Sequence, residues 1–299
     1  MKLTLGPILY HWPADRIIDF YARIADEAPV DRVVLGETVC SKRAPFNEEV
    51  ILHAAARLKR AGKAVALSTL ALPTTRRERR MIADLVGAGF LLEANDVTLL
   101  HHLPAGEPFL VGPLVNVYGE GTLRWFGARG ARTVCLPPEL SIAQAGAMAA
   151  ATAGCGVETE LWAYGRAPLA LSGRCYHARL AGKSRDSCQY VCEADPDGLA
   201  VDTVDGQPFL AVNGVQTLSE AHVNLAGDLA AARAAGVSRL RLSPQTGDMV
   251  AVAQAFRDAL DGRIEDGEAL ARIAGLDPSR RFANGYAAGR RGIDWTHTA

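Results

Sequence analysis

The sequence has few cysteines, no excess of charge of either sign and no long hydrophobic run. Six cysteines in 299 residues are too sparse for a small disulfide-stapled fold. The 32 lysines and arginines balance 33 aspartates and glutamates, which argues against a dedicated nucleic-acid-binding protein. No run of about 18 uncharged apolar residues occurs, so no transmembrane helix is predicted.

The apolar stretch that follows Lys2 is interrupted by Gly6, Pro7 and Asp15 and has no small-residue cleavage site after it, so a signal peptide is not predicted. The expected compartment is therefore the cytoplasm, where thiols stay reduced. Apolar residues make up 49% and charged residues 22% of the chain, as in ordinary globular proteins.

Short apolar segments alternate with helical patterns along the chain. The predicted strands cover residues 3–9, 32–35, 64–68, 89–93, 109–112, 132–136, 158–163 and 238–242. The predicted helices cover residues 14–28, 47–60, 75–86, 96–101, 119–129, 141–153, 219–235 and 248–260. This alternation predicts a single α/β domain over residues 1–299, a TIM-like (β/α)8 barrel. An open dinucleotide-binding sheet would need a glycine-rich first turn, where this chain has YHWPAD.

One unit interrupts the alternation with a long insertion, at about 164–218, after the seventh predicted strand. It contains Cys175, Cys188 and Cys192, and then a predicted hairpin that turns at Asp205 and Gly206. The tail beyond Gly275 is expected to be irregular. Loops that follow the strands of a β/α barrel lie on the face where active sites form, so the insertion is expected to be functional.

A fourth cysteine, Cys40, follows the second predicted strand. Loops after strands two and seven meet at one rim of a barrel, so Cys40 is expected to join the other three. Four thiolates suit an iron–sulfur cluster or a structural zinc ion. Structural zinc prefers two short cysteine pairs and only Cys188 and Cys192 form one, which favours iron–sulfur, with ordinary cysteines as the remaining alternative. Cys135 and Cys155 are predicted to be small core residues.

Four stretches of the chain resemble the peptidase U32 family. They are GETVCSKR at 36–43, YGRAPLALSGRCYHAR at 164–179, the pair Cys188 and Cys192, and NGVQTLS at 213–219. Within the family, the resemblance is to members that act in ubiquinone biosynthesis. It implies a TIM-like barrel and a [4Fe–4S] cluster on Cys40, Cys175, Cys188 and Cys192. It also implies a heterodimer with a homologous U32 subunit (UbiU-like), which hydroxylates a ubiquinone precursor without dioxygen, with prephenate as oxygen donor.

Five residues are candidates for a catalytic role: Glu37, Arg43, Tyr164, Arg174 and His177. The two arginines could hold a carboxylate such as that of prephenate, because a guanidinium matches a carboxylate as a fork. Tyr164 and His177 could move protons, and Glu37 stands at a strand end, where barrel catalytic groups occur. The alternatives are a solvated or cluster-balancing charge for each arginine and a structural hydrogen bond for His177.

Two other functions remain open from the sequence. One is hydroxylation of RNA bases, as in other members of the family, and the other is a non-catalytic electron-transfer or scaffold subunit. Proteolysis is disfavoured because no Ser–His–Asp order, HExxH pair or close carboxylate dyad can be assigned.

Overall fold

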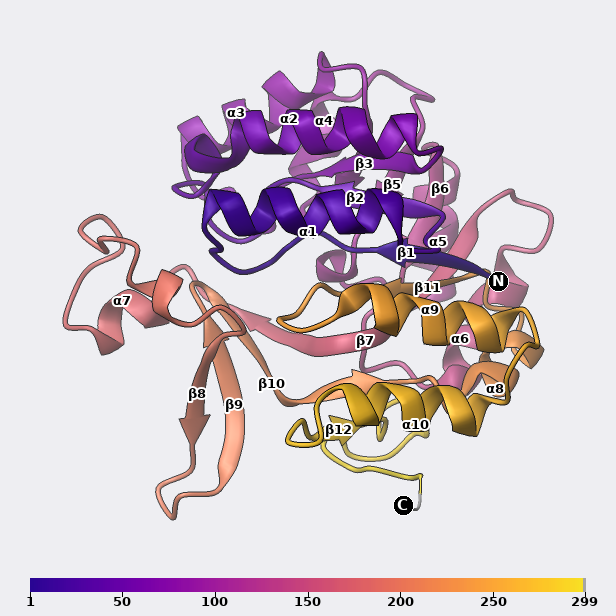
Figure 1. Ribbon diagram of the computed structural model, residues 1–299. Coiled ribbons are helices and arrows are strands. Elements are labelled where there is room, and N and C mark those ends of the chain that lie inside the picture. Colours follow the sequence, from indigo (N-terminus) through magenta and orange to yellow (C-terminus); the bar gives the residue numbers. More distant parts are fainter. Residues whose placement is uncertain (298–299) are drawn as a thin grey trace.

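The computed structural model describes residues 1–297, and its centre is a closed barrel of eight parallel strands (Figure 1). Each strand pairs in parallel with the next, and β11 closes the ring by pairing with both β7 and β1. The barrel strands are β1 (Lys2–Leu5), β2 (Arg32–Leu35), β3 (Ala64–Ser68), β4 (Leu91–Ala94), β5 (Phe109–Val111), β6 (Ala131–Cys135), β7 (Glu158–Leu171) and β11 (Arg239–Leu242). The predicted TIM-like barrel is confirmed.

Helices pack around the outside of this ring. They are α1 (Ala14–Asp26), α2 (Ala44–Arg60), α3 (Arg76–Val86), α4 (Thr98–His102), α5 (Glu120–Gly127), α6 (Ile142–Ala151), α8 (Leu229–Ala234), α9 (Met249–Leu260) and α10 (Asp266–Leu276), with a short 3-10 turn η1 (Pro113–Val115). Local sequence fixes several of their starts: Thr75 and Glu78 form a capping box on α3, and Ser141 and Gln144 form another on α6. Among residues 1–297 no helix has the length and apolar character to cross a bilayer.

The interior of the barrel is partly apolar and partly ionic. Val34, Ala66 and Leu110 form a small apolar cluster of their own, separate from the large core that lies between strands and helices. Arg241 of β11 pairs with Glu93 of β4, which lies on the opposite side of the ring, so the ion pair crosses the barrel. The same guanidinium donates its Nε to Glu160 of β7 at 2.7 Å. All three groups are buried, so each charge depends on the others for compensation.

The predicted helix at 219–235 is wrong in its first half. Residues Gln216–Asn224 form strand β10, and only Leu229–Ala234 is helical. Strand β7 extends past the barrel to Leu171, and β10 pairs with this extension in antiparallel fashion. The hydroxyl of Ser219, where the predicted helix would begin, accepts a hydrogen bond from the amide of Ala167 across the two strands at 2.8 Å. Tertiary pairing therefore overrides the local helical pattern.

The antiparallel extension is completed by β9 (Pro208–Asn213) and β8 (Leu199–Asp202), which pair as the hairpin that the sequence predicts. Figure 1 shows this hairpin projecting from the barrel near α7 (Tyr176–Leu180). A 3-10 turn, η2 (Val191–Ala194), stands between α7 and β8. Gly165, at φ +105°, stands where β7 leaves the barrel. Only glycine fits at this position, because a Cβ there would lie 2.8 Å from the Cβ of Ser243.

Two elements near the C-terminus were not predicted from the sequence. Helix α10 precedes the tail, and the short strand β12 (Phe282–Ala283) pairs with β10. The tail beyond Gly275 is otherwise irregular through residue 297, as predicted. Strand β1 also ends at Leu5 instead of residue 9, because residues 6–9 leave the barrel as a loop on its rim.

Replacing Arg241 with Met should lower the free energy of unfolding by about 3–5 kcal/mol, because it leaves Glu93 and Glu160 buried without their cation. Urea denaturation measures this change. Arg272→Met is the matched control, since Arg272 forms half-exposed ion pairs with Glu268 and Asp258, and it should cost less than about 1 kcal/mol. Equal effects of the two substitutions would contradict the role given to the interior ion pair.

Candidate metal centre

Four cysteines from two distant parts of the sequence line one cavity at the rim of the barrel. Cys40 lies in the loop after β2, and Cys175 begins α7. Cys188 lies in the loop that follows α7, and Cys192 lies in η2. Cys188 and Cys192 are each 9% exposed, the other two are half-buried, and all four are free thiols. The structure thus brings together the four cysteines that the sequence singled out.

The loop that carries Cys40 is fixed by the carboxylate of Glu37. Its Oε1 accepts hydrogen bonds from the backbone N–H groups of Val39 and Cys40, at 2.7 and 2.9 Å. Burial raises the pKa of Glu37, and the nearby Arg43 and these N–H donors act in the opposite direction. Glu37 therefore positions Cys40 through the backbone.

Arg43 is 1% exposed and lines the same cavity as the four cysteines. Its Nη1 donates to the carbonyl of Leu9 at 2.8 Å, and its Nη2 donates to Oδ1 of Asn213 at 3.0 Å. Burial raises the pKa of the Cys192 thiol and of the Cys40 thiol, and the guanidinium of Arg43 counteracts both shifts. Arg43 thus places a fixed positive charge beside two of the thiols, while both of its terminal nitrogens are already bonded.

Two further contacts hold the Cys40 loop against the Cys188 loop. The ammonium of Lys42 donates to the carbonyls of Arg185 and Asp186, at 3.0 and 2.9 Å, and lies 3.7 Å from the sulfur of Cys188. Oε1 of Glu78, on α3, accepts from the hydroxyl of Ser41 at 2.8 Å and from Nη2 of Arg185 at 2.7 Å. Glu78 therefore joins the two cysteine-bearing loops through a buried carboxylate.

The turn between Cys188 and Cys192 uses an uncommon backbone conformation. Gln189 and Tyr190 have φ values of 51° and 54°, in the left-handed region that non-glycine residues rarely occupy. The cost of holding two such residues is of order 1–3 kcal/mol each. This local strain directs the chain so that both cysteines face the cavity, and strain of this kind clusters at functional sites.

His177 is 3% exposed and lines the cavity in a fixed tautomer. Its Nδ1 accepts from the backbone N–H of Gly214 at 2.8 Å, so the ring proton lies on Nε2 and is donated to Asp195 at 3.2 Å. Burial lowers the pKa of His177, and Asp195 opposes that shift. The imidazole is therefore held neutral between two structural partners.

The remaining predicted candidates lie at different distances from this cavity. Arg174 precedes Cys175 and its side chain is exposed. Tyr164 is buried in β7 away from the cavity wall; it accepts a hydrogen bond from Arg280 at 3.3 Å and packs edge-on against Phe256. Burial raises its pKa. Tyr164 is therefore not part of the cysteine site.

Of the two cysteines predicted for the core, one is there and one is not. Cys135 is 1% exposed at the end of β6. Cys155 is exposed, contrary to prediction, because α6 ends at Ala151 and residues 152–156 form a surface turn.

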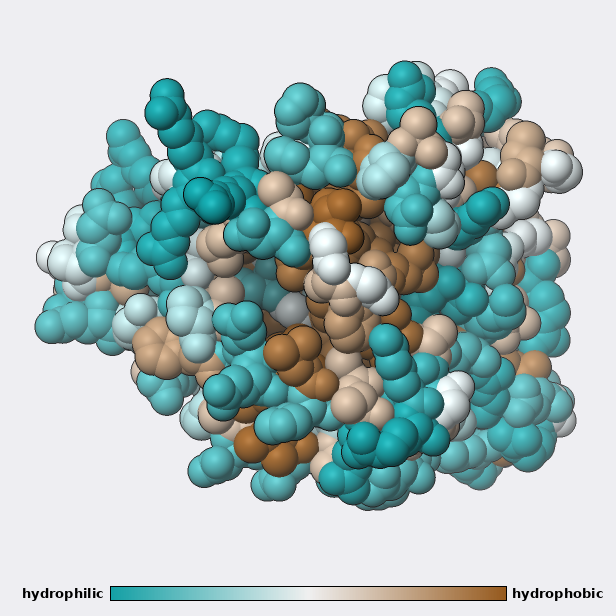
Figure 2. Space-filling view, turned by 90° about the horizontal axis from the view of Figure 1, so that it is seen from above, coloured by the Kyte–Doolittle hydropathy of each residue, from teal (hydrophilic) through white to brown (hydrophobic). Residues whose placement is uncertain are grey.

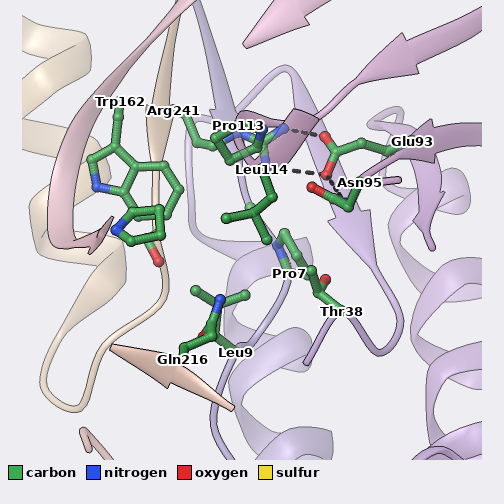
Figure 3. A pocket seen from close by; sticks show the side chains of 13 residues that line it. Pro7, Leu9, Thr38, Glu93, Asn95, Pro113, Leu114, Trp162, Gln216 and Arg241 are labelled. Atoms are coloured by element: carbon green, nitrogen blue, oxygen red, sulfur yellow. Dashed lines mark hydrogen bonds and ion pairs between the residues drawn. The ribbon is translucent and has the colours of Figure 1, made fainter. Parts of the chain in front are cut away.

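Sequence reasoning missed a second polar site, in the mouth of the barrel (Figure 3). Glu93, Asn95 and Arg241 meet there beside Trp162 and Gln216. Oδ1 of Asn95 and Nε2 of Gln216 are buried and lack hydrogen-bond partners within residues 1–297. The cavity measures about 10 Å³, which is room for about one water molecule. The sequence LEAND, with polar residues at the end of a barrel strand, is the signal that could have revealed it.

Chemically, four thiols surrounded by fixed cations suit a soft metal, because thiolates select iron or zinc over magnesium or calcium. No three Cys, His, Asp or Glu side chains in the described part of the chain stand close enough to hold one metal ion. The thiols are instead arranged around a common cavity, with Lys42, Arg43 and Arg185 beside them. Fold and site together define a β/α barrel with a thiol-lined centre at its rim.

A family model described as peptidase family U32 matches residues 21–297, and the chain belongs to that family. Two solved structures resemble parts of it. One is a mandelate racemase/muconate lactonizing protein from Paracoccus denitrificans PD1222 complexed with magnesium, with 14% identity and a TM-score of 0.36 over 53% of this chain and 46% of that chain. The other is a mandelate racemase/muconate lactonizing protein from the same organism, described without magnesium, with 14% identity and a TM-score of 0.37 over 54% of this chain and 47% of that chain. The chain spans about half the length of both structures.

Replacing Glu78 with Gln should destabilise the protein and reduce the pH dependence of its stability. Burial would raise the pKa of Glu78, but hydrogen bonds from Ser41, Thr75 and Thr74 and the charge of Arg185 outweigh it and lower the pKa to about 2. Because the folded-state pKa is depressed, this stabilisation is complete above the ordinary value of 4.5 and is lost as the pH falls toward 2.

Urea unfolding at several pH values checks this prediction. At pH 7 the Glu78→Gln variant should lose about 2 kcal/mol, and its stability should fall less steeply below pH 4.5 than that of the unmodified protein. Glu49→Gln, at an exposed position of α2, should change neither quantity. A pH profile of Glu78→Gln that parallels the unmodified protein would show that this carboxylate does not link the loops.

Proposed function

We propose that this U32 protein is the iron–sulfur subunit of an oxygen-independent hydroxylase in ubiquinone biosynthesis, the role that UbiV-type members fill. It would work with a homologous UbiU-like subunit and with prephenate as oxygen donor. The observation that carries the proposal is the single cavity lined by Cys40, Cys175, Cys188 and Cys192. Family membership agrees with it, and so does the UbiV-like pattern of residues around the cysteines.

The residues around the cavity fit a [4Fe–4S] cluster. The four cysteines would supply its four thiolate ligands, and Lys42, Arg43 and Arg185 would offset the negative charge of those thiolates. When bound, such a cluster would supply one-electron steps, and a hydroxylation without dioxygen needs an acceptor for the two electrons that the ring gives up. Zinc is less favoured because only Cys188 and Cys192 form a short pair of the type that structural zinc sites use twice.

The protein's own side chains would shield and orient the centre. Tyr190, Val191 and Val215 line the cavity beside the thiols and limit the access of water. His177 keeps its proton on Nε2, directed to Asp195. Arg43 uses its terminal nitrogens internally, so Arg174, exposed next to Cys175, is the arginine better placed to hold the carboxylate of an oxygen donor.

Changing Cys40, Cys175, Cys188 or Cys192 singly to Ala should each remove most of the iron. Loss of an outer partner of a metal ligand already costs about 10–100-fold in affinity, and loss of a ligand should cost more. Protein purified without air should contain about four iron and four sulfide per chain and show the visible absorption of thiolate-bound iron.

Cys155→Ala is the matched control, since this thiol is exposed and outside the cavity, and it should retain the full iron content. Cys135→Ala should do the same. Colourless protein with stoichiometric zinc would overturn the cluster, and equal iron loss from Cys155→Ala would show that the ligand set is wrong.

Deleting the gene should abolish ubiquinone synthesis during growth without air and leave it intact with air, and the isolated protein should co-purify with a U32 homologue. Arg174→Ala should retain its iron but lose most of the hydroxylation, whereas Arg179→Ala, exposed on α7, should keep it. Full hydroxylation in Arg174→Ala would favour a passive electron-transfer role. Normal ubiquinone with missing RNA modification would reject the proposal in favour of RNA-base hydroxylation.

A further inference from the structure

A third cavity, of about 560 Å³, lies between the helices α1, α2 and α3 and the strands they cover. This is the size of pockets that enclose drug-sized ligands, whereas the mouth cavity has room for about one water. Figure 2 shows a hollow with apolar side chains gathered around it and hydrophilic ones beyond, on the face that lies over α2 and α3 in Figure 1. Its apolar lining includes Ile17, Tyr21, Leu52, Met81 and Ile82.

The depth of the cavity favours a small molecule over a docked protein. Ile17, Tyr21 and Ile82 belong to the main core and are only 1–2% exposed, yet they form part of its wall. Leu52, at 49% exposure, marks the outer rim. A ligand could thus reach core side chains at one end and extend to the surface along Leu52 at the other.

The charges around the cavity favour a neutral ligand. Three carboxylates line it, those of Glu37, Glu48 and Asp84, against the one guanidinium of Arg77. An anionic lipid such as a fatty acid would meet net repulsion there. The carboxylate of Glu37 is the polar group at the inner end of the cavity, where it can accept a hydrogen bond from a ligand hydroxyl, while the hydroxyl of Ser68 is already bonded to Thr38 and Asn95.

This cavity shares one stretch of chain with the cysteine centre. Gly36 and Glu37 line the apolar cavity, as do Ala44 and Pro45. Cys40 and Arg43, between them in the sequence, line the cysteine cavity. Glu37 faces the apolar cavity and also accepts the N–H of Cys40 at 2.9 Å. A molecule in the apolar cavity would therefore lie one loop away from the thiols.

We propose that the α1–α2–α3 cavity binds a neutral phenol that carries an apolar prenyl chain, with the ring toward Glu37 and the chain toward Leu52. The shape, lining and charge of the cavity assign the neutral apolar class, and the choice of a prenylated phenol rests on the proposed function. The cavity would place the ring to be hydroxylated beside the segment that carries Cys40.

The test is calorimetric titration of the anaerobically purified protein with 2-farnesylphenol, with dodecanoate as the anionic comparison. Met81→Trp should fill the cavity and weaken 2-farnesylphenol binding at least 10-fold, and Arg80→Trp, exposed on the same helix, should not. Leu52→Asp, on the exposed rim where it cannot disturb the core, should also weaken binding, while its neighbour control His53→Asp should not. An unchanged iron content and an unchanged thermal unfolding temperature would show that each variant retains the fold.

Unchanged affinity in both Met81→Trp and Leu52→Asp would overturn the proposal, as would dodecanoate binding that is tighter and equally sensitive to these variants. Loss of the U32 partner from Leu52→Asp, with 2-farnesylphenol binding unchanged, would instead identify the face as a protein interface and reject the ligand site. The outcome is separate from that of the iron experiment. Binding of 2-farnesylphenol by a protein that holds no iron would support the ligand site and reject the proposed function. Bound iron without 2-farnesylphenol binding would support the proposed function and reject the ligand site.

Discussion

The cysteine centre depends on the hydrogen bonds that the guanidinium of Arg43 donates. This guanidinium connects the rim loop after β1, through the carbonyl of Leu9, to the hairpin between β9 and β10, through Asn213. Arg43 itself stands at the start of α2, three residues beyond Cys40. One buried side chain therefore joins the three parts of the chain that must meet if an early cysteine is to face three late ones. Lys42 and Glu78 then hold the Cys188 loop from either side.

Burying a cation at this point is costly unless an anion compensates it. The structure offers Glu37, which raises the pKa of Arg43 against the opposing effect of burial, and the thiols of Cys192 and Cys40 act in the same direction. The positive charge and the thiols are thus mutually dependent. Thiolates bound to a metal would satisfy Arg43 better than neutral thiols do, because the charge would then be permanent. This coupling explains why the buried cation beside Cys40 and Cys192 is an arginine, whose charge is permanent.

The barrel could be predicted from the sequence because each strand and its following helix are local patterns, and eight of them leave closure as the natural arrangement. The grouping of Cys40 with the late cysteines followed from barrel geometry together with the family resemblance. By contrast, β10 was predicted as a helix, because its pairing with the extended β7 is a tertiary interaction that no local pattern contains. The crossing of Arg241 to Glu93 and the apolar cavity were missed for the same reason: each depends on residues that only the closed fold brings together.

The segment from Gly36 to Pro45 forms part of the wall of both the cysteine cavity and the α1–α2–α3 cavity. A loop that only had to present Cys40 would need neither a half-buried glutamate nor an apolar far side. Here Glu37 orders the Cys40 backbone and faces the α1–α2–α3 cavity, while Ala44 and Pro45 form part of the same wall at the start of α2. Because one loop bounds both cavities, a ligand in one would lie next to the segment that carries a thiol of the other. Under the proposed function, this arrangement would hold a ring in the apolar cavity near a cluster on the four thiols, and such proximity favours transfer between them.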